Sequence, residues 1–174
     1  MADASVRPAR SADVAEIARI QLDTWRSAYA GFLPAEALDG VTPDMATAQW
    51  TAAIDDAPSP RHRVLVAQER DSTVGFVAVE PDPDDAAAAS ITTMLVEPRW
   101  GRRGHGSRML AAAVDLARDD GTRRLTAWLF ERDRASVGFY ESAGWSRDGW
   151  TRTLDVAAVP VREVRLHTAL EAVS

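Results

Sequence analysis

Hydrophobic positions recur at helical spacing in the first third of the chain. They predict a helix capped by Ser11 or Asp13. Its apolar residues are Val14, Ile17, Ala18, Leu22, Trp25, Ala28 and Tyr29. We expect Gly31 to end this helix, and two further helices to begin at prolines, over residues 34–38 and 43–53. A short strand over residues 5–8 is predicted before them.

The pattern changes to strands in the middle of the chain. Residues 63–69 and 73–80 are rich in β-branched residues and are separated by the short polar segment 70–72, which predicts an antiparallel hairpin. The acidic segment 81–85 contains two prolines and is expected to be a loop. Another strand is predicted over residues 89–96.

The second half alternates helices and strands. An amphipathic helix follows a glycine-rich turn and ends at residues 119–121. Its apolar face carries Met109, Leu110, Ala113, Val114 and Ala117. Next we expect a strand over 124–130, a helix over 133–142 ended by Gly144, and a last pair of strands around 150–153 and 161–166. No repeat or linker divides the sequence, so we predict a single domain over residues 1–174.

Composition excludes several classes of chemistry. The chain has 174 residues and a net charge of −6. Domains that bind nucleic acids usually carry a positive charge, so no nucleic acid partner is expected. Every basic residue is arginine, which rules out a Walker-A lysine, a Schiff-base lysine and a Ser-Lys dyad. The absence of cysteine rules out disulfides, thiolate metal sites and a cysteine nucleophile.

Three scattered histidines, His62, His105 and His167, show no metal-ligand spacing, so no metal site is predicted. No run approaches the roughly 20 apolar residues that span a bilayer. The start of the sequence, residues 1–6, lacks the pattern of a signal peptide. We therefore expect a cytoplasmic protein with no membrane partner.

The turn Arg102-Arg-Gly-His-Gly-Ser107 is the most informative segment. Two glycines and a helix start would point several backbone N–H groups at one place, with the helix dipole behind them and Arg102, Arg103 and Arg108 alongside. This arrangement suits a phosphate or pyrophosphate, although an ordinary strand-to-helix turn is an equal alternative. A dinucleotide fingerprint fits worse, because Met109 stands where a third small residue is needed.

With this turn in place, the chain resembles the GNAT superfamily of acyl-CoA N-acyltransferases. The family signature Val-x-Pro followed by Arg/Gln-x-x-Gly-x-Gly/Ala matches Val96-Glu97-Pro98 and Gly101-Arg-Arg-Gly-His-Gly106, with Gly101 replacing Arg or Gln. A second family motif, Asn-x-x-Ala-x-x-Phe-Tyr-x-x-x-Gly-Phe, corresponds to residues 133–145. Asp133 there replaces the asparagine and Ser136 the alanine. The order of predicted elements matches the family over nearly the whole chain.

The resemblance implies an α/β (α+β) fold with a mixed, mostly antiparallel sheet of six to seven strands, flanked by helices and splayed between strands four and five. The pantetheine arm of acetyl-CoA, the implied co-substrate, would pair with the backbone of Met94, Leu95 and Val96. The pyrophosphate would lie on the N–H groups of Arg102, Arg103, Gly104, His105, Gly106 and Ser107. Asp133 and Ser136 are expected beside the cofactor. For Asp133, we favour a role as the cap of the following helix.

The family mechanism is direct attack of an amine on the acyl group. Tyr140 matches the family tyrosine that commonly protonates the leaving thiolate, with a purely packing role as the alternative. The base is open: Glu80 is the best remaining carboxylate, and a water relay or a neutral amine would need none. Trp25 and Tyr29 would border the acceptor cleft and, with the acidic 81–85 loop, favour a cationic or aromatic amine. Core packing is the alternative for this pair.

We therefore expect an enzyme that transfers acetyl from acetyl-CoA to an amine of a small molecule, working as a monomer or homodimer. Two alternatives remain open. One is a peptide or protein N-terminal acetyltransferase, and the other is a CoA-binding module without catalytic activity.

Overall fold

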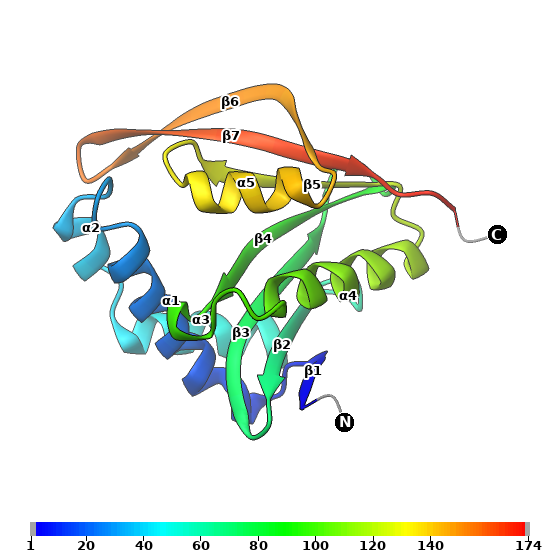
Figure 1. Ribbon diagram of the computed structural model, residues 1–174, viewed down its shortest axis with the longest axis horizontal. Helices are drawn as coiled ribbons and strands as arrows, with labels where there is room; N and C mark the ends of the chain where they lie inside the picture. Colours follow the sequence, from blue (N-terminus) through cyan, green and yellow to red (C-terminus); the bar gives the residue numbers. More distant parts are fainter. Residues whose placement is uncertain (1–2, 173–174) are drawn as a thin grey trace.

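The computed structural model describes residues 3–172 and has a seven-stranded sheet with helices on both faces (Figure 1). The strand order is β1-β2-β3-β4-β5-β7-β6. The strands are β1 (Ala4–Pro8), β2 (Arg63–Glu69), β3 (Ser72–Pro81), β4 (Ala88–Val96), β5 (Arg124–Phe130), β6 (Ser146–Val156) and β7 (Val159–Ala169). The helices are α1 (Val14–Ala28), α2 (Ala35–Asp39), α3 (Pro43–Asp55), α4 (His105–Asp119) and α5 (Arg134–Ser142).

Neighbouring residues of the central strands pack on opposite faces of the sheet. Phe76 of β3 is fully buried in a core that α1 and α3 cover, where its ring meets that of Trp50 edge-on at 5.0 Å. The next residue, Val77, is fully buried in a second core with Met109 of α4 and Val137 of α5. This alternation gives the sheet two buried faces, which explains the long apolar run in β3.

Strands β4 and β5 pair over only part of their length. They run parallel, and residues 88–91 of β4 pair with residues 124–127 of β5. Beyond this point β4 continues to Val96 and β5 to Phe130 without pairing with each other. In Figure 1 the two strands lie together where they begin and separate toward their ends. The predicted splay of the sheet is confirmed.

A β-bulge in β4 lies where the separation begins. Ile91 and Thr93 pair with adjacent residues of β3, so Thr92 is an extra residue. A bulge shifts the alternation of the strand. Ile91 accordingly belongs to the core under α4 and α5, whereas Leu95 belongs to the core under α1 and α3. Without the extra residue, these two side chains would face the same side.

The first helix begins differently from the prediction. Asp13 precedes α1, but its carboxylate makes no cap bond within that helix. It accepts hydrogen bonds from the Arg10 N–H at 2.7 Å and from both terminal nitrogens of Arg7 at 2.8 Å, which ties β1 to α1. The Arg7 hydrogen bond holds the pKa of the Asp13 carboxyl below its usual value. The helix ends at Ala28, earlier than Gly31.

The last two strands are longer than predicted. Both β6 and β7 extend beyond the predicted segments 150–153 and 161–166. β6 is an edge strand that is mostly exposed, so its sequence carries no regular apolar alternation. Ala157 and Ala158 form the turn with positive φ angles of 48° and 64°, where glycine or asparagine would be the usual signal.

Between residues 3 and 172 no helix has the length and apolar character needed to cross a membrane. In the same part of the chain, acidic and histidine side chains do not gather into a group that could bind a metal ion.

Candidate active site

A cavity of about 380 Å³ passes through the gap between β4 and β5. Residues 91–96 of β4 and 128–130 of β5 line its two sides. Trp25 and Tyr29 line it from the α1 face, whereas Ala135, Ser136, Phe139 and Tyr140 of α5 line it from the other face. The first cavity therefore connects the two faces of the sheet.

The predicted cofactor strand lies along this cavity. Met94, Leu95 and Val96 all line it. On one side they pair with residues 75–77 of β3, and on the other the partner strand β5 has already separated. The backbone N–H and C=O groups on that edge are therefore available to an extended chain of amides.

The glycine-rich turn brings backbone donors to one end of the same cavity. Gly104 precedes α4 with a φ of 83°, in the left-handed region that glycine adopts without strain. Within residues 3–172, the N–H groups from Arg102 to Ser107 donate to no protein acceptor, and α4 has no side-chain cap. Gly106 in the first turn of α4 lines the cavity. The turn thus presents the unpaired N–H groups that an anion would need.

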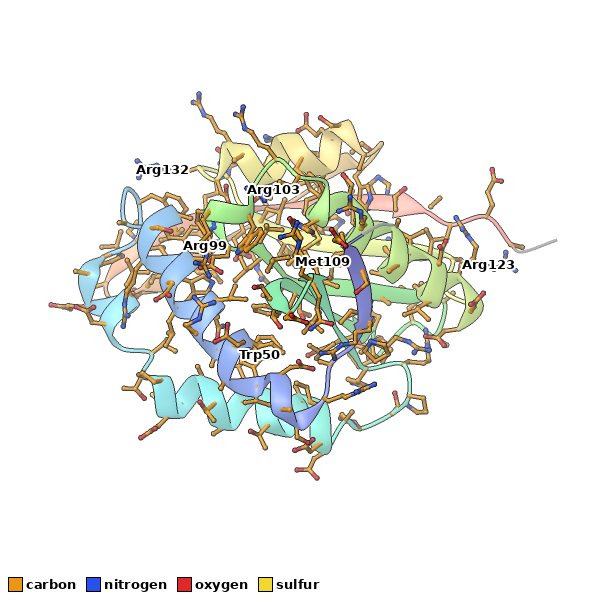
Figure 2. All side chains as sticks on the ribbon, turned by 60° about the horizontal axis from the view of Figure 1, so that its bottom comes forward. Trp50, Arg99, Arg103, Met109, Arg123 and Arg132 are labelled. Carbon is orange, nitrogen blue, oxygen red and sulfur yellow. The ribbon has the colours of Figure 1, made fainter. Side chains whose placement is uncertain are left out.

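Two side chains of the turn anchor it to β2. His105 is 2% exposed, and its Nε2 lies 2.8 Å from Oε2 of Glu69. Arg103 donates to the other oxygen of Glu69 at 3.3 Å. The Cζ atom of its guanidinium lies over the Trp100 ring, 5.0 Å from the ring centroid. These contacts, the His105 hydrogen bond first, hold the pKa of Glu69 below its ordinary value. Arg103 and Arg99 lie where α4 begins, and Arg123 lies near its other end (Figure 2).

The predicted general acid, Tyr140, lies between the cavity and the core. It lines the cavity but is only 2% exposed. Its ring packs edge-on against Trp145 at 4.8 Å and Phe139 at 5.7 Å. Burial raises the pKa of the Tyr140 hydroxyl well above its ordinary value. The hydroxyl therefore keeps its proton at neutral pH, as a general acid must.

Asp133 caps the helix that carries Tyr140. Its Oδ1 accepts from the Ser136 N–H at 3.2 Å, and its Oδ2 accepts from the Ser136 hydroxyl at 2.7 Å. Both residues also line the cavity. The preference for a capping role is confirmed.

Trp25 and Tyr29 lie together at the cavity, with ring centroids 6.4 Å apart. Tyr29 also contacts Phe32 and Phe130 at centroid distances of 5.3 and 5.2 Å. Burial, followed by the charges of two nearby carboxylates, Asp133 and Glu163, raises the pKa of the Tyr29 hydroxyl. The aromatic cluster covers the end of the gap on the α1 side.

Glu163 of β7 is a cavity residue that the sequence analysis missed. It is 7% exposed, and its Oε2 accepts from Nε of Arg152 at 2.6 Å. The Arg152 guanidinium lies 4.3 Å from the centroid of the Trp128 ring, which lines the cavity. A glutamate next to Val164 within the predicted strand 161–166 was the available signal. Its partner Arg152 lies on β6, and only the sheet topology brings the two together.

Glu80, the other predicted carboxylate, lies in a second cavity of about 580 Å³ between the sheet and helices α1 and α3. Glu80 is exposed and does not line the first cavity. Trp25, Thr92 and Thr93 line both cavities, so the two meet at the bulge of β4.

Comparison with known proteins agrees with this architecture. The sequence model of the "Acetyltransferase (GNAT) family" matches residues 19–145. The uncharacterized N-acetyltransferase YuaI of Bacillus subtilis is 25% identical over 166 residues, which cover 93% of this chain and 91% of YuaI.

Two solved structures share the fold. The PaiA N-acetyltransferase of Thermoplasma acidophilum, in complex with coenzyme A, superposes with a TM-score of 0.77 at 12% identity and covers 95% of this chain and 98% of its own. YncA of Salmonella typhimurium, with its cofactor acetyl-CoA, gives a TM-score of 0.74 at 19% identity. The match covers 99% of this chain and 96% of YncA. Since the family model spans most of the sequence, the chain belongs to the GNAT family of N-acetyltransferases.

Proposed function

We propose that this N-acetyltransferase transfers the acetyl group of acetyl-CoA to an amine of a small molecule. The observation that carries the proposal is the first cavity, which joins an unpaired strand edge, a cradle of backbone N–H groups and a protonated tyrosine. The acetyl-CoA and CoA complexes of proteins with this fold support the choice of donor.

The N–H groups of Arg102 to Ser107 would hold the pyrophosphate, with the positive end of the α4 dipole behind them. The free edge of β4 at Met94, Leu95 and Val96 would pair with the amides of the pantetheine arm. These contacts would leave the thioester near the bulge of β4, where the paired part of β4 and β5 ends. From there the acyl carbon faces the α1 side of the sheet.

The reaction needs two proton transfers. The amine nitrogen forms a bond to the acyl carbon, and the bond from that carbon to sulfur breaks. Tyr140 donates its proton to the leaving thiolate and regains one from solvent. Its neutral hydroxyl, buried beside the cavity, supports this role.

The ammonium group of the acceptor must lose its proton. Among the carboxylates lining the first cavity, Asp133 uses both oxygens in the helix cap. Glu163, by contrast, has within residues 3–172 a single hydrogen bond, from Arg152 to Oε2. Oε1 of Glu163 is therefore the available acceptor, directly or through a water molecule. The hydrogen bond from Arg152 holds the carboxylate in place.

A thiol-release assay with acetyl-CoA tests the proposal. The panel contains small amines, amino acids, aminoglycosides and short peptides, and CoA affinity is measured in parallel by calorimetry. Turnover with one or more small amines is the expected result. Turnover with peptides alone would indicate an N-terminal acetyltransferase, and tight CoA binding without turnover of any amine would indicate a non-catalytic module. Either outcome would overturn the proposal.

A further inference from the structure

We infer that the second cavity binds a second positive charge of the acceptor, so that the substrate is a short diamine or an amine with a distal cation. This inference rests on the proposed function, because it takes the first cavity as the site of acetyl transfer. It assigns to the second cavity a part of the acceptor that does not react.

The two cavities meet at the place where the reaction is proposed. Trp25, Thr92 and Thr93 belong to the lining of both. The bulge places these two threonines at the start of the gap, opposite Ala78, which also lines the second cavity. An acceptor whose amine reaches the thioester from the α1 side would therefore extend its other end into the second cavity.

The interior of the second cavity suits an alkyl chain. Trp50 extends from α3 toward α1 and is fixed there because its Nε1 donates to Oε1 of Gln21 at 2.9 Å (Figure 2). Both side chains are buried and line the cavity together with Val64, Ala78 and Val79. Trp25 adds a second tryptophan to the lining.

The charges around the cavity favour a cation at one end. Three ionisable side chains line it: His62, Arg63 and Glu80. Arg63 is paired with Asp120 through two contacts at 2.8 and 3.1 Å, and His62 Nδ1 lies 2.8 Å from the Ser59 hydroxyl. Within residues 3–172, Glu80 has no hydrogen-bond or ion-pair partner. It is the charge in this lining that remains available.

Strand geometry gives the expected distance between the two amines. Glu80 follows Ala78 by two residues and points to the same face of β3. Ala78 pairs with Thr93, so the Cα of Glu80 lies about 7 Å along the strand from the residue pair beside the proposed site of transfer. An extended chain of about four or five carbons between two nitrogens covers this length.

The test compares diaminopropane, diaminobutane and diaminopentane with butylamine, which lacks the second charge. Acetyl transfer is followed by thiol release, and binding of each amine to the CoA complex is followed by calorimetry. We expect the wild type to prefer diaminobutane or diaminopentane over butylamine in kcat/KM. In Glu80→Gln this preference should fall by about five- to tenfold, mainly through KM, with a parallel loss of diamine affinity.

Asp84→Asn is the matched control, because it removes one negative charge from the adjacent loop without touching the cavity lining. It should retain the preference. Equal effects of Glu80→Gln and Asp84→Asn, or an equal loss of turnover with butylamine and the diamines in Glu80→Gln, would overturn the inference. If no amine is acetylated, the proposed function fails, and unchanged diamine affinity in Glu80→Gln would separately refute the second-charge site.

Discussion

Gly106 of α4 and Phe139 of α5 are in contact so close that a Cβ on Gly106 would lie 3.3 Å from Cζ of the ring. Gly106 also lines the first cavity beside Val96. A larger side chain would move either α4 or the phenylalanine next to Tyr140. We therefore expect Gly106→Val to weaken CoA binding by about tenfold or more, as measured by calorimetry.

Gly138 is the matched control for this substitution. It lies in α5 beside Phe139, but a Cβ there meets no atom within 4 Å. Gly138→Ala should raise the free energy of unfolding by about 0.5–1 kcal/mol and leave CoA affinity unchanged. A folded Gly106→Val protein with wild-type CoA affinity would show that this end of the cavity does not hold the cofactor.

Tyr140→Phe removes a hydroxyl and keeps the ring that packs on Trp145. Because the hydroxyl is proposed to protonate the thiolate, kcat should fall about 100-fold with little change in CoA affinity. The raised pKa of Tyr140 means that the wild-type enzyme should not lose activity through this group at neutral or mildly alkaline pH. Steady-state kinetics at several pH values checks both expectations. Unchanged turnover in the variant would assign the proton to another donor.

Glu163→Gln keeps an acceptor for the Arg152 hydrogen bond and removes the proposed proton acceptor. We expect kcat/KM to fall about tenfold or more at neutral pH. The loss should shrink as the pH rises toward the pKa of the amine, because a neutral amine needs no base. A defect of equal size at all pH values would instead indicate that Glu163 acts by positioning Arg152 and the neighbouring Trp128 ring.

Asp133→Asn should retain the cap of α5, since the amide oxygen still accepts from the Ser136 N–H. Stability and activity should both stay near the wild-type values. Asp133→Ala should cost about 1 kcal/mol and lower kcat, because Tyr140 lies on the same short helix. Thermal melts and a rate assay on both variants test this. An inactive but fully stable Asp133→Asn protein would mean that the carboxylate itself takes part in the reaction.

Asp13 gives stability that depends on pH. Its pKa is lowered in the folded state, so its stabilising contribution is present above the ordinary value of 3.8 and is lost as the pH falls through the folded-state value. Asp13→Asn should therefore lower the free energy of unfolding by about 2 kcal/mol at pH 7, and the difference should narrow below about pH 4. Urea unfolding at both pH values measures it. Asp23→Asn, an exposed ion-pair partner of Arg19, should change stability by less than about 1 kcal/mol.

The sequence predicted those parts of the fold in which local pattern and burial agree. The strands over 63–69 and 124–130 have the predicted bounds, because their apolar residues are buried. The bounds of β6 and β7 were not predictable, because β6 is exposed and its turn uses two alanines at positive φ. The bulge at Thr92 leaves no composition signal.

The residues of the candidate site also differ in how far the sequence alone predicts them. The glycine-rich turn and Tyr140 lie in contiguous motifs, and the sequence suffices to name them. Glu163 becomes a cavity residue only because the order β5-β7-β6 brings it beside Phe130 and Arg152. The neutralisation of Arg63 by Asp120 likewise depends on contacts between distant segments. Long-range pairing of this kind is absent from any local pattern.

Because Thr92 is an extra residue, the alternation of side chains between the two faces of the sheet is reversed in the second half of β4. Before it, odd-numbered residues such as Ile91 face α4 and α5, and after it even-numbered residues such as Met94 do. In the proposed function, the acyl donor and the acceptor would therefore meet different side chains, although one strand carries both. Under that proposal, mutations in α1, α3 and β3, which line the second cavity, would alter the acceptor during evolution while the donor side stays the same. One scaffold can thus give rise to enzymes that differ in the amine they modify and share the acetyl donor.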